Sequence, residues 1–163
     1  MVPYRLEVRT QDAATQDFAA TVDAVLTDPR GWQQAGFRLE RRDDAQYLVV
    51  IAEGSEVDAL CAPYRTRSTY SCQNAGVVAF NADRWRSSTP QFTGDLATYR
   101  LYLINHEVGH LLGQRHVRCP GAGLPSPIMV QQSTELDGCL ANGWPLPEEI
   151  AVAARHDQPI APA

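Results

Sequence analysis

Three of the chain's four histidines lie within eleven consecutive residues, which read His106-Glu107-Val108-Gly109-His110-Leu111-Leu112-Gly113-Gln114-Arg115-His116. Residues four apart lie on nearly the same face of an α-helix, so His106 and His110 can direct imidazole nitrogens at one metal ion. His116 cannot reach that ion along the same straight helix, so the chain must turn before it. Gly113 allows the turn, because a residue without a Cβ readily adopts the left-handed conformation that ends many helices. The spacing therefore predicts one metal site with three imidazole ligands.

Zinc suits this ligand set, because it binds imidazole nitrogens at roughly 2.0–2.1 Å in a tetrahedral arrangement. Three protein ligands leave the fourth position open for water, which distinguishes a catalytic zinc site from a structural one. Zinc lowers the pKa of that water toward about 7 and polarises a substrate carbonyl. Glu107 lies beside the first ligand and can act as the general base that passes the water's proton to the leaving amine. We therefore expect one catalytic Zn2+ and hydrolysis of peptide bonds without a covalent intermediate.

The alternative to a metal site is an amphipathic helix whose histidines are ordinary core residues. Such a helix would bury two imidazoles and a carboxylate that need other polar partners, so we favour the metal site. A serine hydrolase is a weaker alternative, because the chain has no G-x-S-x-G turn. The fourth histidine, His156, lies in the C-terminal tail and is expected to be solvated rather than a ligand.

The pattern H-E-x-x-H-x-x-G-x-x-H resembles the signature of the metzincin clan of zinc peptidases, and this chain matches every fixed position of it. Metzincins also carry a methionine turn (Met-turn) beneath the metal, and the resemblance implies that role for Met129, thirteen residues after His116. It further implies an α+β zincin fold with a small, twisted, mostly parallel sheet and an antiparallel edge strand. A backing helix, an active-site helix and an irregular C-terminal half with the Met-turn and a final helix complete the expected architecture.

The whole chain is also similar to an uncharacterised family of exported actinobacterial metzincin-like domains. Two stretches carry this similarity, Asn81–Trp85 and Asn105–Pro120. The similarity implies secretion but no substrate. We expect one catalytic domain over residues 1–163, with a sheet-and-helix half to about residue 113 and a Met-turn half from about residue 114.

Two positions depart from the better-known metzincin branches. Val117 follows the third histidine, where several branches place Ser, Asp, Glu or Pro, and Gln131 stands where some branches have a tyrosine near the metal. The residue that stabilises the oxyanion is therefore open. Tyr64 and Tyr70 can reach the cleft from the first cysteine loop, although ordinary surface or packing roles are favoured for both.

The N-terminal half must position the metal-binding helix, and its hydrophobic pattern predicts a mixed α/β sheet. Alternating apolar residues predict strands at Tyr4–Val8 and Phe37–Arg41, and a continuous apolar run predicts a central strand at Tyr47–Ala52. Apolar residues at helical spacing predict a helix over Ala13–Thr27, with Asp12 as its N-cap. A strand, a helix and two strands in this order are typical of a sheet backed by a helix.

The segment Gly54–Gly76 is predicted to be a long loop, and a strand follows it at Val77–Phe80. The resemblance to zincins implies that this strand binds extended substrate by strand addition. Asp95 is the predicted N-cap of the metal-binding helix, which runs to about Leu112. By the same resemblance, Val130–Thr134 forms part of the wall of the pocket for the residue after the scissile bond.

Two further features lie on either side of the metal-binding segment. Asp83 and Trp85 follow the last predicted strand, where they can line the cleft or serve as a turn cap and a core aromatic. A short final helix is predicted over Pro147–Arg155, because proline and two glutamates suit the positive end of a helix.

Four cysteines, Cys61, Cys72, Cys119 and Cys139, predict two disulfide bonds and an oxidising, extracellular compartment. Three pairings are possible. We favour Cys61–Cys72 and Cys119–Cys139, because each pair closes a short, turn-rich loop. Met1–Pro3 leads straight into the first strand pattern without a signal peptide, so a secreted protein would carry its export signal outside this chain.

Composition excludes several classes of function. The 163 residues carry a net charge of −5, whereas nucleic-acid-binding proteins need a basic face. All fourteen basic residues are arginine, so no lysine can form a Schiff base or act as a general base. No apolar run is long enough to span a bilayer, and we expect a monomer that acts on a peptide or protein substrate. The alternatives are a non-catalytic zinc-containing binding module and an amidase acting on a non-peptide or cell-wall amide.

Overall fold

A five-stranded sheet lies at the centre of the computed structural model, which describes residues 1–155 and 159–161. Its strands are β1 (Val2–Val8), β2 (Leu39–Arg41), β3 (Tyr47–Ala52), β4 (Cys72–Asn74) and β5 (Val77–Asn81). They follow the order β2-β1-β3-β5-β4, in which β4 is antiparallel to β5 and all other neighbours are parallel. The expected mixed α/β sheet with an antiparallel edge strand is therefore confirmed.

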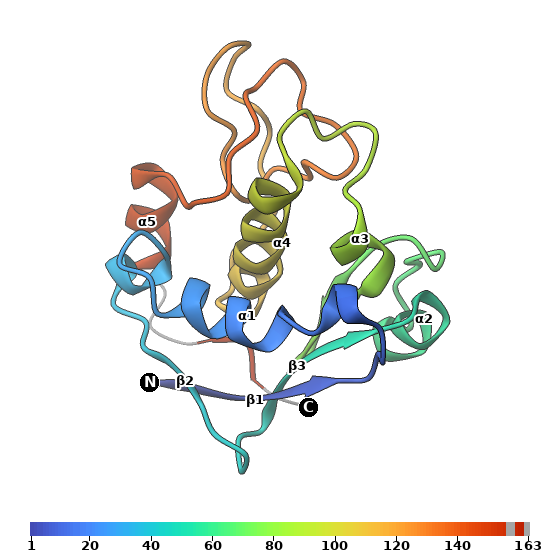
Figure 1. The fold of residues 1–163 in the computed structure, drawn as a ribbon. Helices are drawn as coiled ribbons and strands as arrows, with labels where there is room; N and C mark the ends of the chain where they lie inside the picture. Colours follow the sequence, from blue (N-terminus) through green and yellow to red (C-terminus); the bar gives the residue numbers. More distant parts are fainter. Residues whose placement is uncertain (156–158, 162–163) are drawn as a thin grey trace.

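Helices cover both faces of this sheet. The described chain contains α1 (Phe18–Leu26), α2 (Gly54–Cys61), α3 (Ala82–Arg86), α4 (Leu96–Leu111) and α5 (Pro147–Ala153), with short 3-10 helices at Ala13–Thr15 and Trp32–Ala35. Alternate residues of β3 join different hydrophobic clusters, Val49 with residues of α1 and α4, and Val50 with residues of α2. Figure 1 shows α1 and α4 together on one side of the strands. Because β3 is buried on both faces, its sequence is a continuous apolar run rather than an alternating one.

The expectation of a loop over Gly54–Gly76 is wrong, because this segment contains helix α2 and the edge strand β4. In α2, Val57 and Cys61 lie one helical turn apart and pack against the sheet. Strand β4 has three residues, and it forms because its backbone pairs with β5 and its first residue, Cys72, is disulfide-bonded to α2. Segments this short carry little periodic signal, so tertiary pairing decides their structure.

The helix expected over Ala13–Thr27 is shorter than predicted. The 3-10 helix Ala13–Thr15 comes first, and Asp12, which precedes it, makes no side-chain capping bond. Asp12 instead accepts a hydrogen bond from Arg86 of α3. This partner lies 74 residues away in sequence, and the other carboxylate oxygen of Asp12, Oδ1, has no hydrogen-bond partner among the described residues.

Between α4 and α5 the described chain runs without helices or strands, apart from one isolated bridge between Pro125 and Leu140. The disulfide Cys119–Cys139 closes this segment, and the other disulfide is Cys61–Cys72. Figure 1 shows the closed segment as orange loops that project beyond the N-terminal end of α4. None of the described helices is long and apolar enough to cross a membrane. His156 falls outside the described residues.

Candidate metal centre

Helix α4 carries two of the three clustered histidines and ends just before the third. Asp95 caps its start, because its side chain accepts a hydrogen bond from the Thr98 amide at 2.7 Å. At the other end Gly113 has a φ of 86°, and the amides of Gly113 and Gln114 donate to carbonyl oxygens of the last turn. These paired bonds around a left-handed residue end the helix and redirect the chain toward His116.

The three imidazoles converge through their Nε2 atoms. His116 Nε2 lies 3.2 Å from His106 Nε2 and 3.0 Å from His110 Nε2. Nitrogens bound to zinc at 2.0–2.1 Å in a tetrahedral arrangement would lie about 3.4 Å apart, so these three need to move little to bind one ion. One ligand atom from each ring can be chosen so that all three lie within 4.8 Å of one another. The cluster is therefore compatible with a shared metal ion.

Backbone carbonyls fix the protonation of two of these rings. His106 Nδ1 lies 2.7 Å from the carbonyl oxygen of Ile128, and His110 Nδ1 lies 2.9 Å from that of Gln114. Since a carbonyl oxygen only accepts, both Nδ1 atoms carry the proton and both Nε2 lone pairs face inward. Burial lowers the pKa of all three imidazoles, that of His110 to about 4, which keeps the rings neutral at neutral pH. Converging lone pairs on neutral rings fit a cation between them.

Glu107 follows the first histidine on α4 and lies in the same cleft without joining the cluster. Glu107 is 7% exposed, and burial raises the pKa of its carboxyl to about 8. No described side chain or amide forms a hydrogen bond that offsets this burial. A carboxyl in this environment can exchange a proton with a group in the cleft near neutral pH.

An open cleft of about 400 Å³ contains the histidine cluster and Glu107. One wall is formed by the irregular segment after Met129, which contributes Gln131, Ser133 and Thr134. The wall expected over Val130–Thr134 therefore lies in the cleft, although Val130 itself is buried and does not line it.

Tyr102 is a cleft residue that the sequence did not single out. It lies one helical turn before His106, lines the cleft, and packs on the His106 ring at a centroid distance of 5.1 Å. Its spacing of four residues from the first ligand could have identified it, because positions four apart share a helix face.

The opposite wall is the edge of the sheet. Strand β4 contributes Cys72 and Gln73 to the cleft, whereas β5 lies between β3 and β4 with both of its edges paired. The expectation that Val77–Phe80 binds substrate by strand addition is therefore wrong, because this part of β5 has no free edge. The free edge belongs to β4, which lies inside the segment that was predicted as a loop.

Residues 62–71, here called the rim loop, connect α2 to β4 and border the cleft. The rim loop brings Tyr64 and Tyr70 to the lining of the cleft, together with Arg65, Thr66 and Ser71. Tyr64 is 61% exposed, so its ring is available for contact with a bound molecule. Both tyrosines therefore lie at the cleft, and the exposure of Tyr64 also fits the surface role that the sequence favoured.

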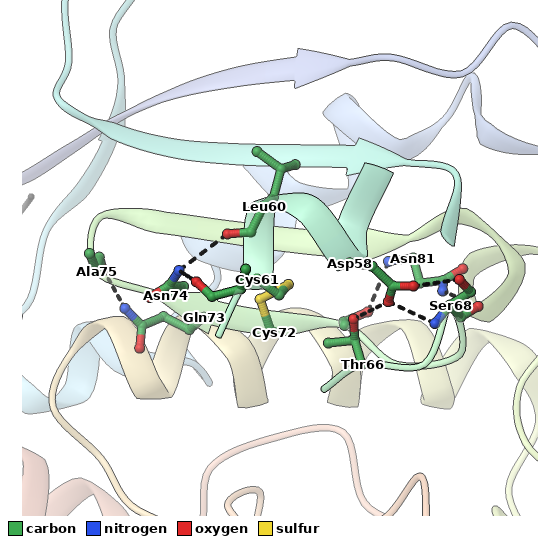
Figure 2. The surroundings of a disulfide bond; sticks show 12 residues. Asp58, Leu60, Cys61, Thr66, Ser68, Cys72, Gln73, Asn74, Ala75 and Asn81 are labelled. Atoms are coloured by element: carbon green, nitrogen blue, oxygen red, sulfur yellow. Dashed lines mark hydrogen bonds between the residues drawn. A yellow bond between two sulfur atoms is a disulfide. The ribbon is translucent and has the colours of Figure 1, made fainter. Parts of the chain in front are cut away.

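The rim loop is fastened at several points, which Figure 2 shows. The Cys61–Cys72 disulfide closes its base. Asp58 of α2 accepts hydrogen bonds from the hydroxyls of Thr66 and Ser68 and from the Ser68 amide. From the end of β5, the Asn81 side chain donates to the Ser68 carbonyl oxygen at 2.9 Å. The cleft wall is therefore tied to both α2 and the sheet.

Comparison with known proteins places this chain in a family. The model of a family described as a protein of unknown function (DUF3152) matches residues 3–148. The chain belongs to the DUF3152 family. A search of curated proteins finds no match. Among solved structures, the chain resembles the crystal structure of a zinc-dependent peptidase from Methanocorpusculum labreanum, with 12% sequence identity over 94% of this chain and 100% of that chain and a TM-score of 0.48. At this identity and TM-score the resemblance carries no functional assignment.

In this DUF3152 protein a methionine packs beneath the histidines. Met129 is 2% exposed, and its carbonyl oxygen accepts a hydrogen bond from the Val117 amide at 3.1 Å. A Cβ added at Gly109 would lie 2.6 Å from Met129 Sδ and 2.9 Å from Trp32 Cζ2. The missing side chain of Gly109 therefore lets the methionine approach α4 between its two histidines, a role that ligand spacing alone does not reveal.

Asp83 and Trp85 of the DUF3152 chain lie outside the cleft. Trp85 is fully buried, contacts Phe18 edge to face, and donates from Nε1 to Asp17 at 3.1 Å. Asp83 is exposed in the first turn of α3 and pairs with Arg86. Trp85 therefore has the expected role of a core aromatic. The expected turn cap at Asp83 is wrong, because the side chain that caps α3 is that of Asn81, which accepts a hydrogen bond from the Asp83 amide.

Proposed function

We propose that this protein is a zinc-dependent metallopeptidase in which His106, His110 and His116 bind the metal and Glu107 is the general base. The observation that carries the proposal is the convergence of three imidazole nitrogens beside a buried carboxyl in an open cleft. A structural zinc site is closed by four protein ligands. Within the described residues no fourth His, Cys, Asp or Glu joins the cluster, which supports a catalytic site.

Glu107 moves the proton in the proposed reaction. Zinc, when bound, supplies Lewis-acid polarisation of a carbonyl and lowers the pKa of a water molecule. Glu107 accepts a proton onto a carboxylate oxygen as water adds to the scissile carbonyl, and then donates it to the departing amine nitrogen as the C–N bond breaks. Burial raises the pKa of Glu107 and a nearby cation acts in the opposite direction, so one carboxyl can both take and return the proton.

An extended peptide is the substrate form that the cleft favours. The outer edge of β4 is unpaired among the described residues, and a peptide can hydrogen-bond to it by strand addition. Gln131, Ser133 and Thr134 on the opposite wall would then contact the side chain after the scissile bond. Tyr64 and Tyr70 on the rim loop are further candidates for contact with the peptide.

We assign the proposed enzyme to the metzincin type, as one catalytic domain over residues 1–163 with Met129 as the Met-turn residue. The extended histidine motif, the left-handed turn at Gly113 and the packing of Met129 against Gly109 support this type. The two disulfides support a secreted protein, because such bonds persist in oxidising compartments.

Metal analysis followed by digestion of a peptide library tests the proposed function. The native chain is compared with Glu107→Ala and with Glu135→Ala, which removes an exposed carboxylate that does not line the cleft. We expect about one zinc per chain in all three proteins, and roughly 10²–10⁴-fold slower cleavage in Glu107→Ala alone.

Native cleavage rates in Glu107→Ala would contradict the proposed mechanism. Zinc without turnover of any peptide would instead favour the binding module. Release of products from cell-wall fragments but not from peptides, measured by mass spectrometry, would favour the amidase.

A further inference from the structure

Glu149 of α5 is a buried side chain, 9% exposed, that accepts three backbone hydrogen bonds. Its Oε2 atom accepts from the Ile128 amide at 2.8 Å and from the Leu146 amide at 2.9 Å. Its Oε1 atom accepts from the Met129 amide at 2.9 Å. The bond from the Leu146 amide is a helix-capping bond, which joins the backbone at the start of α5 to the glutamate three residues further on. The other two donors lie 21 and 20 residues away, so helix capping does not explain them.

The segment that Glu149 holds also holds a metal ligand. The Ile128 carbonyl oxygen accepts the hydrogen bond from His106 Nδ1 at 2.7 Å. Glu149 therefore binds Ile128 at its amide, and His106 binds the same residue at its carbonyl. Two successive hydrogen bonds connect the carboxylate on α5 to the orientation of an imidazole on α4.

The second oxygen of Glu149, Oε1, holds the residue that packs against α4. It binds the Met129 amide, and the Met129 side chain packs beneath the histidines against Gly109. One carboxylate thus fixes two neighbouring residues, one of which orients a ligand ring while the other supports the helix that carries two ligands.

We propose that Glu149 is a positioning residue of the metal centre, which holds the Ile128–Met129 turn so that the Ile128 carbonyl orients His106 for metal binding. The proposal rests on the metal site of the proposed function and not on the peptidase reaction. The partner of a ligand imidazole sets its tautomer and ring orientation, and loss of such partners typically weakens metal affinity by roughly 10–100-fold. Glu149 acts one step further out, through the backbone that supplies the partner.

Only a carboxylate can accept all three of these hydrogen bonds, and another polar side chain of this size cannot. Three amide donors converge on Glu149, so both of its oxygens must accept. A glutamine has one accepting oxygen, and its NH2 group would face either the Met129 amide or the amides of Ile128 and Leu146. Burial raises the pKa of the Glu149 carboxyl, and the three amides partly offset the rise. Glu149→Gln therefore changes the number of acceptors and almost nothing in volume.

Zinc affinity, measured by competition with a chelator, tests this role in three variants. Glu149→Gln removes one acceptor, and Glu148→Gln is the matched control at an exposed position in the same helical turn. Leu146→Pro removes the amide that donates to Glu149 at the start of α5, and the Leu146 φ of −81° is close to that of proline. We expect about 10–100-fold weaker zinc binding in Glu149→Gln and native affinity in the two controls.

Native zinc affinity in Glu149→Gln would overturn the proposal. An equal loss of affinity in Leu146→Pro would also overturn it, since the effect would then come from the start of α5. These affinities are measured without any substrate. A native chain that binds zinc but cleaves no peptide would therefore contradict the proposed function and leave this proposal standing.

Amide hydrogen exchange in the native chain decides the question if Glu149→Gln does not fold, as judged by circular dichroism of the metal-free protein. Coupling between two sites is reciprocal, so zinc should slow exchange at the Ile128 and Met129 amides more than at the Leu146 amide. Unchanged exchange at Ile128 and Met129 on addition of zinc would overturn the proposal.

Discussion

Gly109 lies between the two histidines of α4, and its hydrogen faces Met129 and Trp32, which are 2% and 1% exposed. Neither neighbour can withdraw freely, because Met129 is buried and Trp32 donates from Nε1 to the Asn105 carbonyl oxygen at 2.9 Å. In an ordinary helix interior alanine is more stable than glycine by roughly 0.5–1 kcal/mol. At this position packing opposes that preference.

We expect Gly109→Ala to lower the free energy of unfolding of the metal-free protein by about 1–2 kcal/mol, since overpacking of a core typically costs about 1–3 kcal/mol and helix propensity returns part of it. Urea unfolding measures the change. Adding Met129→Ala to this variant should give a non-additive result, because the truncated side chain makes room for the new methyl group. A Gly109→Ala protein more stable than the native chain would show that the close approach is not a constraint.

The proposed ligands and the proposed general base could be named from the sequence, because they lie close together and their spacing follows the helix. His106 and His110 need only the 3.6-residue period to share a face. Glu149 could not be identified in this way. Its two decisive partners, Ile128 and Met129, lie in an irregular segment whose path is set by tertiary contacts, and no periodicity connects them to α5.

Among the elements, those with an apolar pattern or a clear helix start were predicted, whereas α2, α3 and β4 were not. Strand β3 has the predicted bounds, Tyr47–Ala52, and α4 begins after the predicted cap, Asp95. The three-residue strand β4 was missed, because its structure depends on pairing with β5 and on the disulfide to α2. The missed strand forms the free edge beside the cleft. Because β4 was not predicted, substrate binding was assigned to the neighbouring strand β5 instead.

The rim loop beside β4 has two consecutive left-handed residues, Arg67 and Ser68, with φ of 56° and 51°. This conformation costs roughly 1–2 kcal/mol for each residue other than glycine. Asp58 offsets the strain by binding the loop. Hydrogen bonds from the Ser68 and Thr66 hydroxyls, and then from the Ser68 amide, hold the pKa of Asp58 below its ordinary value of 3.8.

Acidification should therefore release the rim loop. Because the folded-state pKa of Asp58 is lowered, its contribution is present above pH 3.8 and is lost as the pH falls through the lowered pKa. We expect the Ser68 amide resonance to titrate with a midpoint below 3.8, and Asp58→Asn to abolish this transition and speed exchange of the same amide. A midpoint at or above 3.8 would show that these bonds do not anchor the loop.

At the scale of the whole molecule, the histidine cluster joins two parts of different character. Helix α4 packs with α1 and the sheet in the main hydrophobic cluster, and it supplies His106 and His110. His116 and Met129 come from the irregular segment that follows, where the Cys119–Cys139 disulfide, with a sequence separation of 20, stabilises by roughly 3 kcal/mol. A metal ion bound to all three histidines would connect this segment directly to α4.

Removal of the metal should therefore lower the stability of the whole chain. A ligand at about 1,000 times its dissociation constant stabilises the folded state by about 4 kcal/mol. For a chain of 163 residues, each kcal/mol raises the melting temperature by roughly 2–4 °C, so zinc at that concentration should raise it by roughly 8–16 °C. Differential scanning calorimetry with zinc or with a chelator measures the shift. Glu107→Ala should keep it, because Glu107 is not a ligand, whereas His116→Ala should lose most of it. An equal shift in His116→Ala would mean that zinc stabilises the protein from another site.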